Sequence, residues 1–172
     1  MKPYDYKKDP YWPSFDGVRG YTVEVDRLKS MASALRNNSD PRLFPKGIMF
    51  SGTPGTGKTT LAKAFIAMTG FSCFIPGACP DSRSLSKIYD QASRKTPSIV
   101  FLDDVDRIVS VLGSEGFISD ESQACLKEIL ARLDGVEDSK GVITVMTTNE
   151  YSNLDEAMKR SGRVDLHIPI NK

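Results

Sequence analysis

The feature that most limits the possible folds is a series of short apolar runs separated by longer amphipathic segments. The runs that fit buried strands span 47–50, 71–75, 98–102, 142–146 and 164–170. The segments with apolar residues at three- and four-residue spacing span 22–36 and 58–68, then run from Asp81 to before Pro97 and from Asp120 to Gly135. Apolar strands that alternate with such helices indicate a parallel sheet covered on both faces. We therefore predict an α/β fold, a three-layer sandwich around a five-stranded parallel sheet.

Residues 1–14 differ from the rest of the chain. They contain three prolines and four aromatic residues, and they follow neither a helical nor a strand period. We expect an irregular N-terminal arm whose aromatic side chains fasten it to the domain surface, with a partner-binding segment as the alternative. Residues 15–172 then form a single α/β domain, in which Asp81 and Asp120 cap two helices and a glycine-containing loop follows residue 102.

The composition fits a globular protein and gives little support to a nucleic-acid-binding or membrane-spanning protein. Hydrophobic residues make up 40% and charged residues 26% of the 172 positions, and the formal net charge is +1. Such a balance gives no bulk indication of a nucleic-acid partner. No apolar run approaches the roughly 18 residues of a membrane-spanning helix, and the first residues do not resemble a signal peptide. We therefore predict a cytoplasmic setting and no membrane segment in this chain.

The cysteines and the histidine indicate no metal centre. Cys73, Cys79 and Cys125 are an odd number and form no CxxC pair, so we expect buried free thiols in a reducing compartment. His167 is the only histidine and has no second ligand near it in the sequence, which argues against zinc binding. The chain also contains no HExxH, so it is not itself a zinc protease of that class.

A glycine-rich sequence joins the first predicted strand to a helix. Residues 52–59 match GxxxxGK[ST], a pattern that is meaningful when a strand precedes it and a helix follows it. The glycines let the backbone fold around phosphate groups, which the N–H groups and the helix N-terminus attract. We expect Lys58 to reach the β- and γ-phosphates and the Thr59 hydroxyl to ligate Mg²⁺, the alternative being a turn that only begins a helix. The predicted nucleotide-binding residues of this loop are Gly52, Thr53, Pro54, Gly55, Thr56, Gly57, Lys58, Thr59 and Thr60.

The third predicted strand ends in carboxylates. Asp103, Asp104 and Asp106 follow the apolar run 98–102. In open α/β sheets ligands bind beyond the carboxyl ends of the strands, so these acids would face the phosphates. We predict that Asp103 holds Mg²⁺ and that Asp104 polarises the attacking water. Without the glycine-rich loop, acids at a strand end would more often belong to a solvated turn.

With these two motifs the sequence resembles the AAA family of P-loop ATPases, from about Phe15 to the end of the chain. The matching segments are FDGVRG at 15–20, PKGIMF at 45–50, LARLDG at 130–135, MTTN at 146–149 and LDEAMKRSGRVD at 154–165. The resemblance implies the large α/β subdomain of a P-loop NTPase, with ATP and Mg²⁺ as its cofactors. It also implies that the backbone at Val18 and Gly20 lies against adenine, and that Asn149 contacts water or the γ-phosphate.

The same resemblance implies how subunits assemble. In the family, the two arginines that correspond to Arg160 and Arg163 point into the nucleotide site of the neighbouring subunit. We therefore expect a homo-oligomer, a hexameric ring, in which these two residues act on the neighbour's nucleotide. The resemblance further implies a protein substrate for this ring.

Three features depart from the family pattern. Asp104 stands where the family has glutamate, so its carboxylate is one methylene shorter, which predicts slow hydrolysis or a shifted water. The segment 76–84 is short and lacks the aromatic-apolar-glycine loop with which threading AAA unfoldases grip peptides. In that respect, and in MTTN and GRVDL, this FtsH-like chain is closer to the mitochondrial inner-membrane AAA translocase that moves a folded Rieske protein. The family's helical lid would begin where the chain ends, so we expect no lid in this chain: either the lid lies on another chain, the chain is a fragment, or the lid is absent.

Two functional hypotheses follow. The first is an ATP-driven motor that remodels or moves a protein substrate in a ring of like subunits, which intact Lys58, Asn149, Arg160 and Arg163 favour. The alternative is a nucleotide-dependent assembly or scaffold module with little turnover, which the shorter acid at Asp104 and the missing lid favour.

Overall fold

The predicted strands form one parallel sheet in the computed structural model, which describes residues 2–109, 118–135 and 140–171. The strands are β1 (Gly47–Ser51), β2 (Ser72–Phe74), β3 (Ser98–Leu102), β4 (Val142–Thr148) and β5 (Leu166–Pro169). They lie in the order β2-β3-β4-β1-β5, and each neighbouring pair is parallel. The predicted five-stranded parallel sheet is therefore confirmed.

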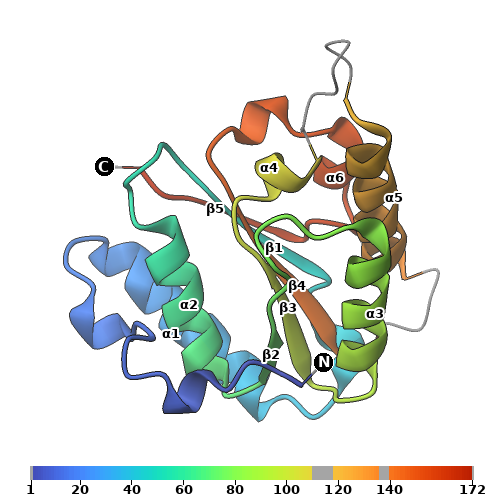
Figure 1. The fold of residues 1–172 in the computed structure, drawn as a ribbon. Helices are drawn as coiled ribbons and strands as arrows, with labels where there is room; N and C mark the ends of the chain where they lie inside the picture. Colours follow the sequence, from blue (N-terminus) through green and yellow to red (C-terminus); the bar gives the residue numbers. More distant parts are fainter. Residues whose placement is uncertain (1, 110–117, 136–139, 172) are drawn as a thin grey trace.

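Helices cover both faces of this sheet (Figure 1). One face carries α1 (Thr22–Asn37) and α2 (Lys58–Thr69), and the other carries α3 (Ser82–Ser93) and α5 (Asp120–Asp134). Two shorter helices, α4 (Val105–Val109) and α6 (Glu156–Lys159), lie on the same side as α3 and α5. Single 3-10 turns occur at Tyr6–Lys8, Phe15–Gly17, Pro41–Leu43 and Tyr151–Asn153.

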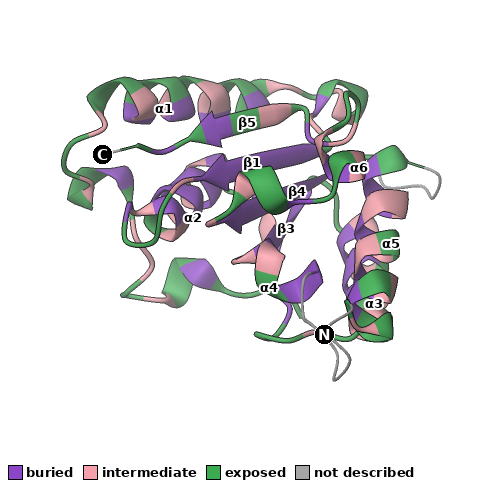
Figure 2. Cartoon of the chain, turned by 90° about the horizontal axis from the view of Figure 1, so that it is seen from above, coloured by how far each residue is buried: buried purple, intermediate pink, exposed green. Residues whose placement is uncertain are grey.

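The central strands β3, β4 and β1 are buried from both sides, which explains why they are mostly apolar (Figure 2). Ile48 and Phe50 of β1 pack in one core cluster with α1 and α2, whereas Met49 packs in the other with α3 and α5. Successive side chains of a strand point to opposite faces of the sheet, so a single run of residues fills two cores. The three-layer arrangement is thus a direct consequence of the apolar runs.

Several details differ from the sequence prediction, among them the bounds of β2 and β5, which are shorter than the predicted strands 71–75 and 164–170. β4 continues to Thr148, whereas the predicted strand ended at residue 146. The helix α4 forms directly after β3, where we expected only a loop; residues 110–117 of that loop lie outside the described residues. The N-cap of α5 is Ser119 and not Asp120, because Ser119 has extended backbone angles and its hydroxyl accepts a hydrogen bond from the Ser122 N–H at 3.2 Å. The predicted cap at Asp81 is confirmed.

The cysteines differ from one another in exposure. Cys73 and Cys125 are buried free thiols, and burial raises the pKa of Cys73 to about 12 and that of Cys125 to about 11. Cys79 is exposed, contrary to the prediction, because it lies in the connection between β2 and α3. Within residues 2–109, 118–135 and 140–171, no helix is long and apolar enough to cross a membrane.

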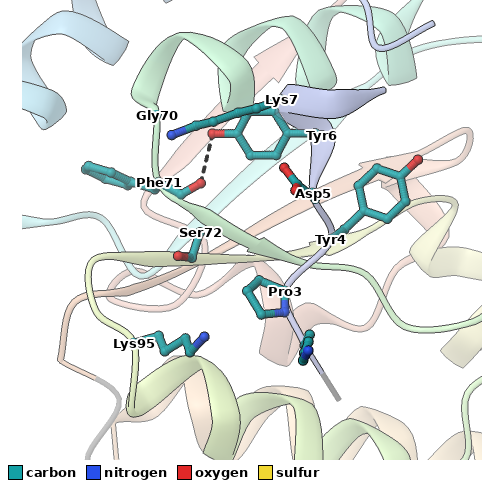
Figure 3. Close-up of a pocket in the computed structure, with 10 residues that line it drawn as sticks. Pro3, Tyr4, Asp5, Tyr6, Lys7, Gly70, Phe71, Ser72 and Lys95 are labelled. Carbon is teal, nitrogen blue, oxygen red and sulfur yellow. Dashed lines mark hydrogen bonds between the residues drawn. The ribbon is translucent and has the colours of Figure 1, made fainter. Parts of the chain in front are cut away.

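Hydrogen bonds and a buried ring fasten the N-terminal arm to the domain. Tyr6 is buried, and its hydroxyl donates to the Phe71 carbonyl at 2.9 Å (Figure 3). The indole N–H of Trp12 donates to the Lys63 carbonyl at 2.9 Å. The Tyr4 N–H donates to a carbonyl of the edge strand β2 at 2.7 Å, which forms an isolated antiparallel bridge. The arm thereby covers part of a sheet edge that could otherwise pair with another chain.

Candidate nucleotide-binding site

The glycine-rich loop lies at the carboxyl end of β1, between this strand and α2. Because β4 lies between β1 and β3, the carboxyl ends of these three strands meet at one end of the sheet. Two glycines permit the path of the loop. Gly57 has a φ of +88°, and a Cβ at Gly52 would lie 2.2 Å from the carbonyl oxygen of Ile170. The more exposed loop residues are Thr53, Pro54 and Gly55, and Thr60 is exposed in the first turn of α2.

Lys58 is buried at the start of α2, with 5% of its surface exposed. Its Nζ donates to the Thr53 carbonyl oxygen at 2.9 Å, and the Thr56 hydroxyl donates to the same oxygen at 2.8 Å. Within the described residues, no carboxylate forms an ion pair with Lys58. Because a buried ammonium without a counter-charge is costly, the loop favours an anionic ligand. Phosphate groups fit this loop by charge and by its available N–H donors.

The predicted metal-binding residues lie in contact. Asp103 follows β3, and its Oδ1 accepts a hydrogen bond from the Thr59 hydroxyl at 2.9 Å. The same oxygen accepts a second one from the Thr147 hydroxyl at 2.6 Å. Magnesium in proteins usually takes one or two side-chain oxygens together with phosphate oxygens and waters. The oxygen atoms of Thr59 and Asp103 therefore fit Mg²⁺ by their chemistry and by their position beside the loop.

The predicted water-polarising acid and the predicted sensor amide also lie together. Asp104 Oδ1 accepts a hydrogen bond from Asn149 Nδ2 at 3.2 Å. The backbone of Asp104 is left-handed, with a φ of +50°, a region that aspartate enters more readily than most residues. Its N–H donates to the Thr147 hydroxyl at 2.8 Å. The turn after β3 thus directs the carboxylates of Asp103 and Asp104 to different partners.

Thr147 is the residue of this site that the sequence prediction missed. Its hydroxyl accepts from the Asp104 N–H and donates to the Asp103 carboxylate, so it links both acids. The sequence alone gives no signal for this contact, which follows from the order of the strands in the sheet. β3 and β4 are adjacent and parallel with Leu102 opposite Met146, so the next residue of each strand, Asp103 and Thr147, must also be neighbours.

The entry segment lies beside the loop. Gly20 helps to line a hollow of about 640 Å³, and Val18 is half-buried against the core cluster of α1 and α2. The hollow is lined by Arg19, Gly20, Tyr21, Thr22, Val23, Glu24 and Asn171. The hydroxyl of Tyr21 donates to the Thr56 carbonyl at 2.9 Å, which joins this hollow to the glycine-rich loop. The contact of Val18 and Gly20 with adenine stays a prediction.

The two arginines predicted to act across an interface have different surroundings. Arg163 donates to both carboxylate oxygens of Asp134, at 2.5 and 2.8 Å, and to the Ala157 carbonyl at 2.6 Å. The hydrogen bond from Arg163 lowers the pKa of the Asp134 carboxyl. Arg160 is exposed, and its side chain has no hydrogen bond or ion pair within the described part of the chain. Within the described part of the chain, neither arginine forms a hydrogen bond or ion pair with a residue of the glycine-rich loop.

Comparisons with known proteins identify the family of the chain. The model of the ATPase family associated with various cellular activities (AAA) matches residues 48–172. The chain is 34% identical over 177 residues to an ATP-dependent zinc metalloprotease FtsH of Paraburkholderia phymatum, over 92% of this chain and 27% of that protein. It is 36% identical over 172 residues to the 26S proteasome regulatory subunit 8 homolog of Saccharomyces cerevisiae, over 90% of this chain and 42% of that protein. The chain spans less than half the length of either relative. By these matches, the chain belongs to the AAA family of ATPases.

Proposed function

We propose that the chain binds MgATP at the glycine-rich loop and hydrolyses it in a ring of like subunits, in order to remodel or move a protein substrate. The observation that carries this proposal is the buried Lys58, which forms no ion pair with a carboxylate among the described residues, beside the Thr59–Asp103 contact of 2.9 Å. The triphosphate of ATP would supply the negative counter-charge that the buried Lys58 ammonium does not find in the described protein residues. Thr59 and Asp103 supply the hard oxygen ligands that Mg²⁺ prefers.

Each side chain has a distinct role in the proposed reaction. Lys58 and the loop N–H groups bind phosphate oxygens. Thr59 and Asp103 hold Mg²⁺, which neutralises charge on the phosphates when it is bound. Asp104, which Asn149 holds at 3.2 Å, accepts the proton of the attacking water.

The proposed substrate is a folded or assembled protein and not a threaded chain. The exposed tip of the connection between β2 and α3 consists of Gly77, Ala78 and Cys79, none of which is aromatic. Such a tip offers no ring that could grip an extended peptide in the centre of a ring of subunits. We also propose a reducing, cytoplasmic setting, in which the cysteines stay free.

Lys58→Ala tests nucleotide binding most directly. We expect roughly 100-fold weaker ATP binding or worse, because the change removes the buried positive charge from the loop. Isothermal titration calorimetry would measure the affinity. Lys63→Ala is the matched control, because Lys63 lies on the same helix but faces Trp12 instead of the loop. Wild-type ATP affinity in Lys58→Ala would refute the proposed site.

Thr147→Val tests the link between the two acids. Valine keeps the shape of threonine but leaves the Asp104 N–H and the Asp103 carboxylate each without one partner. We expect roughly tenfold slower hydrolysis, and a loss of about 1 to 3 kcal/mol in the free energy of unfolding, because a polar group in a buried site loses its hydrogen bond. Thr148→Val is the control, since that hydroxyl accepts only from the Glu150 N–H among the hydrogen bonds of the described residues. Steady-state ATPase assays and thermal unfolding would compare the two variants, and equal turnover in both would remove Thr147 from the site.

A nucleotide-dependent assembly module with little turnover is the second candidate, and the observation that favours it is the shorter acid at Asp104. Steady-state ATPase assays at several protein concentrations separate the two functions. A motor gives specific activity that rises as subunits assemble. A scaffold module assembles with nucleotide yet shows negligible turnover at every concentration.

A further inference from the structure

Tyr21 has a backbone conformation that is rare for a bulky residue. Its φ of 56° and ψ of 35° lie in the left-handed region, and among the described non-glycine residues only Asp104 shares a positive φ. Asp104 belongs to the proposed catalytic turn, and aspartate tolerates this region better than tyrosine does. The unusual backbone of Tyr21 therefore calls for a local explanation.

The side chain of Tyr21 provides that explanation. Its hydroxyl donates to the Thr56 carbonyl at 2.9 Å, across 35 positions of sequence, and the ring packs against the core cluster of α1 and α2. Thr56 is itself buried, and its own hydroxyl donates to the Thr53 carbonyl at 2.8 Å. Two hydrogen bonds thus restrain Thr56. Its hydroxyl is bonded to the Thr53 carbonyl within the glycine-rich loop, and its carbonyl is bonded to the Tyr21 hydroxyl outside the loop.

This contact fixes the orientation of one peptide group. The bond between Thr56 and Gly57 is trans, so its C=O and N–H point in opposite directions. Because the carbonyl points to Tyr21, the Gly57 N–H points away from Tyr21, and it has no protein acceptor among the described residues. Gly57 has a φ of +88° and no Cβ, so it has no side chain that would restrict the rotation of this peptide plane.

We propose that Tyr21 is a positioning residue for phosphate binding: its hydroxyl holds the Thr56 carbonyl so that the Gly57 N–H stays directed at a phosphate oxygen. This inference rests on the proposed function, because it assumes that the loop binds the phosphates of ATP. A donor that is oriented before the ligand arrives costs less to use than one that must be ordered on binding. We therefore expect the Tyr21 hydroxyl to affect the binding of the phosphates of ATP and not the binding of its base.

Tyr21→Phe isolates the hydroxyl, because the ring and its packing remain. We expect about fivefold weaker binding of MgATP and of tripolyphosphate, the effect of one net hydrogen bond, and unchanged binding of adenosine. The KM for ATP should rise by a similar factor while kcat stays within about twofold. Calorimetry for MgATP and nuclear magnetic resonance titrations for the two weaker probes would give the three affinities for the whole chain.

A second readout does not depend on nucleotide. In protein labelled with ¹⁵N-glycine, Tyr21→Phe should change or broaden the Gly57 amide resonance, since the peptide plane loses its restraint, while Gly135 at the end of α5 should not change. Tyr6→Phe is the matched control. It removes a bond of the same length, from a buried tyrosine hydroxyl to the Phe71 carbonyl at 2.9 Å (Figure 3). Phe71 directly precedes β2, so this bond lies at the end of the sheet opposite to the glycine-rich loop. Tyr6→Phe should bind all three probes like the wild type.

The outcomes separate this inference from the proposed function. Weaker MgATP and tripolyphosphate binding with unchanged adenosine binding, together with an altered Gly57 resonance, supports the role of Tyr21. Equal weakening of adenosine would show that Tyr21 acts through the base, and an unchanged affinity for MgATP would also overturn the inference while leaving the proposed function in place. Failure of the wild type to bind MgATP would overturn both.

Discussion

Asp104→Asn is expected to lower kcat for ATP hydrolysis by roughly 100- to 10,000-fold while the affinity for MgATP stays within about twofold of wild type. The amide keeps the shape of the side chain, and its oxygen can still accept the hydrogen bond from Asn149. It cannot take a proton from the attacking water. Calorimetry and single-turnover hydrolysis would measure the affinity and the chemical step separately.

Asp103→Asn is the matched control, because it makes the same change in the neighbouring acid. Asp103 accepts hydrogen bonds from Thr59 and Thr147 and is the proposed Mg²⁺ ligand, so this variant should first lose Mg²⁺-dependent binding. Equal turnover in wild type and Asp104→Asn would remove Asp104 from catalysis. Similar defects in both variants would show that the two acids do not have separate roles.

Asp104→Glu addresses the length of the acid. The longer side chain resembles the family pattern, but it would move the carboxylate away from its present contact with Asn149. A rise in kcat would show that the missing methylene limits turnover in the wild type. A fall would show that Asn149 and the left-handed turn at Asp104 are matched to the shorter acid.

The parts of the structure that the sequence predicts well are those encoded within short segments. The apolar runs predict the strands, because residues such as Met49 and Phe50 fill cores on both faces. The glycine-rich loop is likewise a local pattern with a local geometry. The helix α4 is harder, because Val105, Ile108 and Val109 have helical spacing but the segment is too short to separate it from a loop.

The parts that the sequence does not predict depend on how distant segments meet. Thr147 reaches Asp103 only because of the register between β3 and β4, and Tyr21 reaches Thr56 only because α1 and α2 pack on one face. The resemblance to AAA ATPases identifies Arg163 but not its partner Asp134, which lies 29 positions earlier. Contacts between residues so far apart in the sequence can be predicted only once the fold is known.

Arg160→Ala is expected to lower kcat by roughly 1,000- to 100,000-fold with little change in MgATP affinity, the range typical of arginines that stabilise a transferring phosphoryl group. Arg160 is exposed, and its side chain forms no hydrogen bond or ion pair within the described residues, which is compatible with the proposed action on a neighbouring subunit. Calorimetry and ATPase assays would measure the two effects. If Arg160 acts on the neighbouring subunit as proposed, the specific activity of the wild type should rise with protein concentration, because the proposed site is complete only on assembly.

Arg163→Ala is the informative comparison. The sequence assigns both arginines to the neighbour's site, but Arg163 is held by Asp134 and the Ala157 carbonyl of its own subunit. Arg163→Ala should therefore lower the melting temperature as well as turnover, whereas Arg160→Ala should lower turnover alone. Thermal unfolding of the two variants, measured without nucleotide, would test this difference. Equal melting temperatures would show that the contacts of Arg163 contribute nothing to stability.

Mixed oligomers give the sharpest test of action across an interface. A Lys58→Ala subunit has an intact Arg160 but a defective loop, whereas an Arg160→Ala subunit has an intact loop. Where the first subunit presents its arginine to the loop of the second, one interface carries a complete site. Mixing the two inactive variants should therefore restore part of the activity, and mixing Lys58→Ala with a Lys58→Ala/Arg160→Ala double variant should restore none. Absence of recovery in oligomers shown to contain both variants, or full turnover by isolated monomers, would exclude an arginine that acts on the neighbouring subunit.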